Sequence, residues 1–214
     1  MKTHILIVDD HPLVRQGLVA ALSHNIDFEV VGEASDGDEA IDKARSLKPG
    51  IMLLDISLPG KNGLEVLKVL HAELPEISVL ILSAFPEKQY AIRCFANGAR
   101  GYLTKKSASE ELLAAIRKVR SGGKYVSETM ADLLANEIGS DAKRLPHERL
   151  SDREFQVLCL LGQGKSVSEA AKILSLSLST INTYRAHILD KMQMDTTAQL
   201  IRYVLDNNLV ESPQ

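Results

Sequence analysis

The sequence of 214 residues lacks any long hydrophobic run. No apolar stretch approaches the roughly 20 residues that a membrane-spanning helix needs. The amino terminus, MKTHILIVDD, also lacks the apolar core and the small-residue cleavage site of a secretory signal. We therefore expect a cytoplasmic protein that makes no contact with a membrane.

Cysteine and net charge are scarce as well. The two cysteines, Cys94 and Cys159, lie far apart, with no second thiol or histidine at the spacing of metal ligands. This spacing suggests neither a disulfide framework nor a zinc site, so both cysteines are expected to be small core residues. The formal net charge is only −3. Overall charge therefore does not indicate a nucleic-acid-binding protein.

Short β-branched runs alternate with amphipathic runs over the first 125 or so residues. The apolar runs are HILIV, FEVVGEA, IMLLD, SVLILS and GYLT. Such alternation is typical of βα repeats, and continuous apolar runs suit a parallel sheet that is covered on both faces. We predict an α/β fold with a doubly wound, five-stranded parallel sheet of the flavodoxin-like type.

The pattern changes towards the carboxyl-terminal part of the chain. One more amphipathic helix is expected over 128–138, and the segment GSDAKRLPHER that follows is polar and aperiodic, as linkers are. Beyond it only helices are expected, over 152–162, 167–174, 178–192 and 197–207. We predict an α/β domain over 1–125, a helix and linker over 126–149, and an all-α domain of four helices over 150–214.

Polar side chains follow the predicted strands where each one ends. Asp9 and Asp10 come after the first strand, Asp55 after the third, Ser83 ends the fourth and Lys105 follows the fifth. In an open parallel sheet, ligands bind beyond the carboxyl ends of the strands near the reversal of strand order. If these strands are neighbours, three carboxylates meet there, and they would repel one another without a cation. Mg²⁺ accepts carboxylate, water and phosphate oxygens and fits such a site.

A carboxylate beside Mg²⁺ can act as a nucleophile. Asp55 could accept a phosphoryl group as an acyl phosphate, while Lys105 neutralises phosphoryl oxygens and Ser83 donates a hydrogen bond. Taken singly, these residues are more often a solvated acid, a surface lysine and a turn hydroxyl. Their common place at strand ends favours a single site.

Four segments, IVDDHPLVRQGL, LLDISLPGKNGLE, LILSA and GARGYLTK, resemble the landmarks of response-regulator receiver domains over roughly the first 125 residues. The resemblance implies Asp55 as the phosphoacceptor and a Mg²⁺ ion bound by Asp10, with Asp9 assisting. It adds the backbone carbonyl of Ser57 as a further ligand, and Gly63 matches the loop where the chain turns sharply.

The same resemblance implies a switch. Ser83 and Tyr102 would be the switch residues and Lys105 the phosphate partner. In this family the residues two positions after the phosphoacceptor and after the switch hydroxyl affect an attacking water, and here they are Ser57 and Phe85. A bulky Phe85 predicts slow self-dephosphorylation.

Two predicted helices joined by the short turn SLS suggest a helix-turn-helix in the second half. Ile181, Ile188 and Met192 fall on one stripe of the second helix, which could enter a major groove about 12 Å wide. The alternative is a small helical bundle that binds protein. The nearly balanced charge of residues 150–214, with six Lys and Arg against seven Asp and Glu, slightly favours that alternative.

The segments LSDREFQVL, GKSVSEAAKIL and STINTYRAHILDKM resemble the LuxR-type helix-turn-helix of NarL/FixJ-type response regulators, over about the last 65 residues. The resemblance implies base contacts from Asn182, Thr183 and Ala186. The phosphate contacts it implies are Lys165, Ser177, Ser179, Arg185 and Lys191. Many relatives place basic residues where Asn182 and Ala186 stand, so no DNA target carries over.

Together these features predict a transcriptional regulator rather than an enzyme. A sensor histidine kinase or a phosphotransfer protein would phosphorylate Asp55, and a homodimer would then bind double-stranded DNA with inverted or tandem half-sites. Three alternatives stay open: DNA binding that is independent of phosphorylation, a metal-dependent phosphohydrolase and a flavodoxin-like cofactor carrier. Neither Ser57 nor Phe85 supplies the acid or base that a hydrolase needs, and the two adjacent aspartates would repel a cofactor phosphate.

Overall fold

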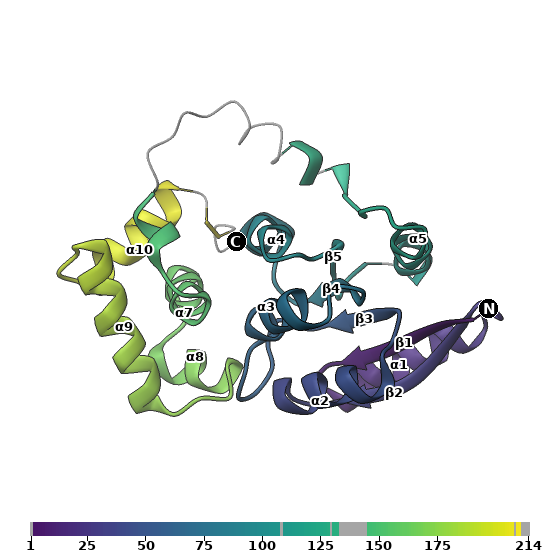
Figure 1. Cartoon of the computed structure of the whole chain (residues 1–214). Coiled ribbons are helices and arrows are strands. Elements are labelled where there is room, and N and C mark those ends of the chain that lie inside the picture. The colour runs from purple at the N-terminus through teal and green to yellow at the C-terminus, as the bar shows by residue number, and fades with distance from the viewer. Residues whose placement is uncertain (1, 108, 129, 133–144, 208, 211–214) are drawn as a thin grey trace. The chain divides into compact units, whose positions relative to one another are not determined.

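The computed structural model describes residues 2–107, 109–128, 130–132, 145–207 and 209–210 (Figure 1). The chain forms two compact units, residues 1–138 and 139–214. Within the described ranges, no helix is both long enough and apolar enough to span a bilayer. The boundaries predicted for the two domains and the linker stay predictions.

The first unit contains a five-stranded sheet in which every pairing is parallel. Its strands are β1 (Thr3–Val8), β2 (Phe28–Ala34), β3 (Ile51–Leu54), β4 (Ser78–Ser83) and β5 (Gly101–Thr104). The strand order is β2-β1-β3-β4-β5. The order reverses at β1, so the carboxyl ends of β1 and β3 flank the place where such sheets bind ligands. The predicted doubly wound sheet is confirmed.

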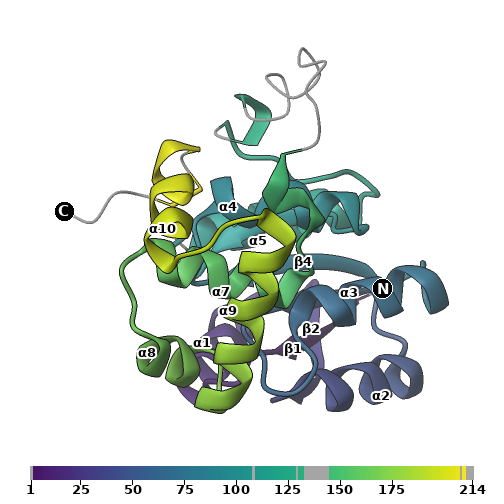
Figure 2. The ribbon, with the colours of Figure 1, turned by 90° about the vertical axis from the view of Figure 1, so that its left-hand side faces the viewer.

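Helices cover both faces of this sheet (Figures 1 and 2). They are α1 (Pro12–Ser23), α2 (Gly37–Leu47), α3 (Gly63–Glu73), α4 (Glu87–Ala96) and α5 (Ser109–Arg120). Leu22 of α1 and Ile116 of α5 pack into one core with alternate strand residues such as Ile7 and Leu53. The right-handed crossovers of a parallel sheet place α2, α3 and α4 on the opposite face. Residues 129 and 133–138 of the helix predicted over 128–138 lie outside the described residues.

Gly63 begins α3 directly against the backbone of Asp55. A Cβ atom on Gly63 would lie 2.1 Å from the carbonyl oxygen of Asp55 and 2.8 Å from the Cα of Ile56. The left-handed turn of this loop is at Gly60, whose φ is +67°. Gly63 is therefore required for close approach between the loop and the end of β3.

The variant Gly63→Ala is expected to lower the free energy of unfolding by about 2 kcal/mol, because the added methyl group must push backbone atoms apart. Urea denaturation measures this. The matched control is Gly17→Ala in α1, where a Cβ meets nothing within 4 Å. Equal free energies of unfolding for the two variants would show that the loop before α3 moves to accommodate the methyl group without losing stability.

The second unit is built from helices alone over its described residues. It contains the 3-10 helix η1 (Pro146–Arg149) and the helices α7 (Asp152–Gly162), α8 (Val167–Ile173), α9 (Leu178–Met192) and α10 (Thr197–Asp206). α7 and α9 have the predicted bounds, and α8 and α10 each end one residue earlier than predicted. Ser151 and Glu154 form a reciprocal capping box at the start of α7, which satisfies backbone donors that a helix start leaves free.

Close packing holds the helix-turn-helix in place. Gly162 of α7 lets Val204 of α10 approach, since a Cβ on Gly162 would lie 2.3 Å from a Val204 methyl carbon. The predicted apolar stripe of α9 faces the core of this unit, and its residues Ile181 and Ile188 are fully buried. Cys159 of α7 is buried in this unit and Cys94 of α4 in the first, so the prediction of two core cysteines is confirmed.

Candidate functional site

The predicted acidic residues meet at the end of the sheet. Asp9 and Asp55 follow neighbouring strands, and the Asp55 N–H continues the ladder by donating to the carbonyl of Val8 at 2.9 Å. Both aspartates are buried, with 1% and 2% of their surface exposed. Ligand atoms of Asp9, Asp10, His11 and Asp55 all lie within 4.8 Å of one another. The burial of two acids side by side demands a positive charge nearby.

Lys105 provides that charge. Its ammonium Nζ lies 2.6 Å from Asp9 Oδ2 and 2.7 Å from Asp55 Oδ2. The backbone fixes this residue at the sheet edge, because the Lys105 N–H donates to the Ser83 carbonyl at 2.7 Å. Resemblance implies Lys105 as a phosphate partner; in the structure it bridges two carboxylates that the fold brings together.

Burial and charge act on these groups in opposite directions. Burial raises the pKa of Asp55 above its usual value, although Lys105 opposes the shift. Burial also acts to lower the pKa of Lys105, but its contacts with Asp55 and Asp9 outweigh burial, and the pKa is raised. Asp55 Oδ1 is buried and has no hydrogen-bond partner. A free carboxylate oxygen among three aspartates fits a hard divalent cation such as Mg²⁺.

His11 belongs to the same cluster, although no sequence motif assigned it a role. Its Nδ1 lies 2.6 Å from Asp10 Oδ1 and 3.3 Å from Asp9 Oδ1. Its backbone N–H also donates to Asp9 Oδ1 at 2.9 Å. The only signal in the sequence was its position directly after the two aspartates.

A chain of hydrogen bonds links the end of β4 to β5. Ser83 is fully buried, and its Oγ accepts from the N–H of Phe85 at 3.3 Å. The Tyr102 hydroxyl donates to the carbonyl of Phe85 at 2.9 Å. The Phe85 ring packs against Tyr90 of α4, with 4.8 Å between ring centroids. Burial raises the pKa of Tyr102 well above its ordinary value, so its hydroxyl stays a donor.

Helix α9 exposes the residues predicted to read bases: Asn182, Thr183 and Ala186. Two of them already use their donors within the helix. The Asn182 amide donates to the Leu178 carbonyl at 3.0 Å, and the Thr183 hydroxyl donates to the Ser179 carbonyl at 3.0 Å. The Thr183 hydroxyl must change its rotamer to donate to a base, whereas the Asn182 amide keeps a second N–H and its Oδ1 for base contacts.

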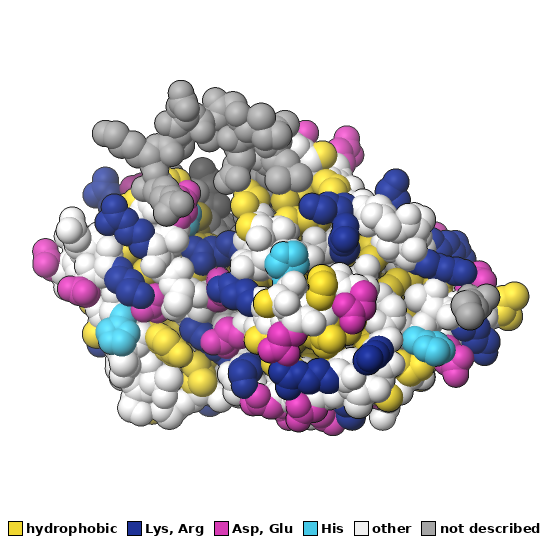
Figure 3. All heavy atoms as spheres, in the orientation of Figure 1, with side chains coloured by type: hydrophobic (Ala, Val, Ile, Leu, Met, Phe, Trp, Pro, Cys, Tyr) yellow, Lys and Arg dark blue, Asp and Glu magenta, His cyan; other side chains and the backbone are white. Residues whose placement is uncertain are grey.

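The residues predicted to contact phosphate differ in their surroundings. Ser177 caps α9, and its Oγ lies 2.7 Å from the hydroxyl oxygens of both Ser179 and Thr180. Within the described part of the chain, Lys165 and Arg185 form no ion pair. Side chains of both signs are mixed over the face in Figure 3, which agrees with the small net charge.

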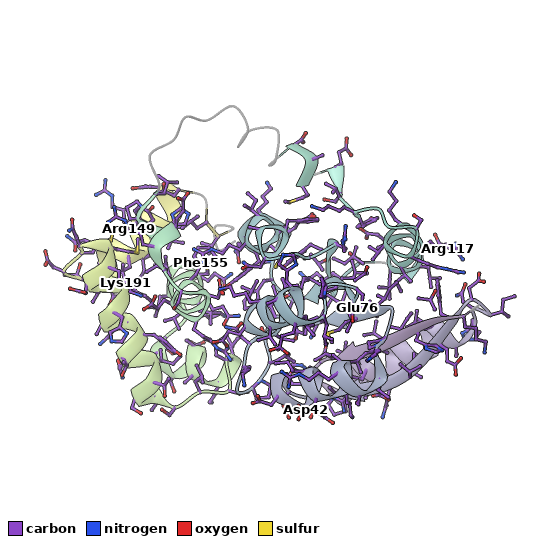
Figure 4. All side chains as sticks on the ribbon, viewed as in Figure 1. Asp42, Glu76, Arg117, Arg149, Phe155 and Lys191 are labelled. Carbon is purple, nitrogen blue, oxygen red and sulfur yellow. The ribbon has the colours of Figure 1, made fainter. Side chains whose placement is uncertain are left out.

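Lys191, also predicted to contact phosphate, forms an ion pair within the protein. Its Nζ contacts both carboxylate oxygens of Glu154, at 2.7 and 2.8 Å. Figure 4 labels Lys191 on α9, and Glu154 precedes the labelled Phe155 on α7. Glu154 also completes the capping box of α7, whose N-cap is Ser151. Lys191 therefore ties the exposed helix to the unit's core, and a phosphate contact would have to share it with Glu154.

Two family models match the chain. Residues 5–117 match the response regulator receiver domain. Residues 148–204 match the bacterial regulatory proteins of the luxR family. The chain is a response regulator. It belongs to the group in which a receiver domain precedes a LuxR-type DNA-binding domain, as the sequence predicted.

Known proteins resemble this response regulator over most or nearly all of its length. The oxygen regulatory protein NreC of Staphylococcus aureus (strain JH9) is 36% identical in an alignment of 214 positions that covers 97% of this chain and 99% of that protein. A LuxR-family response regulator structure from Aurantimonas sp. SI85-9A1 is 32% identical, with a TM-score of 0.61, covering 65% of this chain and all of that one. RcsB from Salmonella enterica serovar Typhimurium, bound to promoter rprA with phosphomimetic BeF3⁻, is 25% identical, with a TM-score of 0.64 and 96% and 99% coverage.

The contact between Glu154 and Lys191 is expected to make the stability of the regulator depend on pH. Burial acts to raise the pKa of Glu154, but hydrogen bonds from Lys191 and Ser151 outweigh it, so the pKa is lowered. A folded pKa below the unfolded value gives stability that is present above the unfolded pKa, about 4.3, and is lost as pH falls through the folded pKa.

We therefore expect Glu154→Gln to lose about 1 kcal/mol of unfolding free energy near neutral pH and progressively less at lower pH. Denaturant unfolding of the full chain over this pH range measures the difference. Glu169→Gln, at the exposed capping box of α8, controls for capping without the lysine contact. A deficit that does not depend on pH would contradict the ion-pair explanation.

Proposed function

We propose that the response regulator is phosphorylated on Asp55 and that this controls DNA binding by its LuxR-type domain. The observation that supports the proposal is that the two oxygens of the Asp55 carboxylate differ. Lys105 donates a hydrogen bond to Oδ2, whereas Oδ1 is buried and has no hydrogen-bond partner. Oδ1 can attack the phosphorus of a phosphohistidine on a sensor kinase or phosphotransfer protein. The P–O bond forms as the P–N bond breaks, and the imidazole leaves and takes up a proton.

Receiver domains commonly bind Mg²⁺ at an acidic site of this kind. Asp9, Asp10, Asp55 and the carbonyl of Ser57 would hold the ion, which supplies positive charge to phosphoryl oxygens. Lys105 would then exchange part of its contact with the carboxylates for a phosphoryl oxygen. In this proposal the chain is a switch rather than an enzyme, because its own acyl phosphate is the product that matters.

The hydrogen bonds around Phe85 would carry the switch. A phosphoryl oxygen on Asp55 offers the Ser83 hydroxyl a new acceptor. The Phe85 N–H donates to the Ser83 hydroxyl, and the Phe85 carbonyl accepts from the Tyr102 hydroxyl. A shift of Ser83 would therefore also move Tyr102 of β5 and, through the Phe85 ring, Tyr90 of α4. Phosphorylation changes activity only if it favours one of two arrangements energetically.

The proposed output is DNA binding by a homodimer in the cytoplasm. Asn182, Thr183 and Ala186 would face base edges in the major groove, and Asn182 can pair with adenine. Lys165, Ser177, Ser179, Arg185 and Lys191 would lie near phosphates. Two-fold or tandem pairing of such domains places the recognition helices about one DNA turn apart, roughly 34 Å.

Selection of bound DNA from a random pool tests this proposal. The full-length protein is used with Mg²⁺, with and without beryllofluoride. We expect a shared half-site that repeats at about one helical turn and is enriched far more strongly with beryllofluoride. No enrichment in either condition would refute DNA recognition by α9.

One observation favours a second candidate, a regulator that binds DNA independently of phosphate. Tyr102 is buried and its hydroxyl donates to the Phe85 carbonyl, and a regulator held in this one arrangement would need no phosphoryl group to bind DNA. Equal enrichment of the same half-site with and without beryllofluoride would support this candidate.

The proposed lifetime of the acyl phosphate depends on Phe85. Phe85→Glu is expected to shorten the phosphate half-life about tenfold, since a carboxylate there can position or activate water. Phe85→Leu keeps an apolar side chain and controls for the lost contact with Tyr90. Decay of the acyl phosphate is followed after removal of the phosphodonor. An unchanged half-life in Phe85→Glu would contradict slow dephosphorylation through shielding.

A further inference from the structure

The receiver unit contains a second concave site at the opposite end of the sheet from Asp55. The cavity encloses about 320 Å³ between the ends of α3 and α4 and the beginnings of β4 and β5. Val79 lies near the start of β4, and Arg100 directly precedes β5, whereas Asp55 and Lys105 follow the carboxyl ends of their strands. Pockets that bind small molecules measure roughly 300–1,000 Å³, so this cavity suits a small ligand.

The lining combines positive groups with apolar walls. His71, Arg100 and Lys124 line it together with Leu67, Val79 and Phe95. Among the lining residues that the structure describes there is no aspartate or glutamate. None of the three basic side chains forms an ion pair with a described residue. Lys124 Nζ instead lies 5.8 Å from the centroid of the Phe95 ring.

The backbone fixes the positions of two lining residues, Gly98 and Arg100. Gly98 has a φ of +97°, and a Cβ there would lie 2.4 Å from His71 Nδ1, so only glycine leaves room for the imidazole. The backbone of Arg100 forms two hydrogen bonds: its N–H donates to the Val79 carbonyl and its carbonyl accepts from the Tyr125 N–H, each at 2.8 Å. The backbone of the site is therefore preorganised, which reduces the entropy lost when a ligand binds, while the side chains of His71 and Lys124 remain exposed.

We propose that this cavity binds a small organic anion, a carboxylate or sulfonate with a compact aromatic or aliphatic body. The anionic group would lie against Arg100 and Lys124, where no protein carboxylate competes, and His71 would donate a hydrogen bond. The apolar body would fill the space between Leu67, Val79 and Phe95. Such a ligand contacts α3, α4 and the start of β5, so the regulator would respond to a dissolved metabolite as well as to phosphorylation.

Benzoate is the probe for the test, with benzyl alcohol as its uncharged counterpart. Binding to the full-length protein is followed by NMR chemical-shift changes of backbone amides around Gly98. We expect saturable binding of benzoate and binding of benzyl alcohol that is at least about tenfold weaker, because charge-assisted hydrogen bonds supply much of the affinity. Arg100→Ala and Lys124→Ala should each weaken benzoate binding about tenfold.

Lys88→Ala removes an exposed lysine from the other end of α4 and should leave benzoate affinity unchanged. Unfolding curves and phosphorylation of Asp55 show whether each variant keeps its fold. Absence of saturable benzoate binding, equal binding of benzyl alcohol, or equal loss in Lys88→Ala and Arg100→Ala would each overturn the proposal. None of these results depends on DNA binding, so the test is separate from that of the proposed function.

Discussion

The variant Asp55→Asn is expected to take up no phosphate from acetyl phosphate and Mg²⁺, whereas the unchanged protein gains one phosphoryl group. An amide oxygen is a poor nucleophile, so no acyl phosphate can form at this position. The fold should survive, because asparagine has the shape of aspartate and one of the two buried negative charges beside Lys105 is removed. Intact-protein mass spectrometry measures phosphoryl uptake directly.

Asp42→Asn is the matched control for this loss. Asp42 lies on α2, is exposed and pairs only at the surface with Arg45 at 3.5 Å (Figure 4). This variant should be phosphorylated as the unchanged protein is. Phosphate uptake by Asp55→Asn equal to that of the control would place the acceptor on another carboxylate, Asp9 or Asp10 first.

The second large effect concerns Lys105. Lys105→Met leaves the buried carboxylates of Asp9 and Asp55 without their cation, and removal of one partner from a buried ion pair costs about 3 kcal/mol or more. We expect a decrease of about that size in the free energy of unfolding, measured in urea near neutral pH without Mg²⁺. Added Mg²⁺ should stabilise this variant by more than it stabilises the unchanged protein, since only a cation can replace the lost charge.

The pH dependence separates this explanation from simple loss of packing. The pKa of Asp55 is already raised by burial against the opposing effect of Lys105, and without Lys105 it should rise further. A carboxyl group whose folded pKa exceeds its unfolded value contributes stability that is full below the unfolded pKa and lost as pH rises through the folded pKa. The deficit of Lys105→Met should therefore shrink on acidification from about pH 7 to about pH 5.

Lys106→Met is the control, because Lys106 is the exposed neighbour of Lys105. Its stability should match that of the unchanged protein at both pH values. A deficit of Lys105→Met that stays constant with pH and does not respond to Mg²⁺ would mean that Lys105 acts through packing alone.

Much of the architecture could be predicted from local patterns. The five apolar runs became the five strands, and α7 and α9 start and end at the residues expected from the sequence pattern. The placement of Asp9, Asp55 and Lys105 at strand ends was also visible, since a parallel sheet aligns its carboxyl ends. His11 was missed because a histidine beside two aspartates has no distinctive spacing.

The sequence by itself determined that two domains form, which elements they contain and which polar residues stand at strand ends, because these follow from side-chain periods and local turn chemistry. Only the tertiary structure decided that Lys105 bridges Asp9 and Asp55, that Lys191 is bound to Glu154, and that His71, Arg100 and Lys124 share one cavity. These contacts join residues far apart in the chain. Their distances depend on how helices pack and on where glycine lets backbones approach, and neither is recorded in any local pattern.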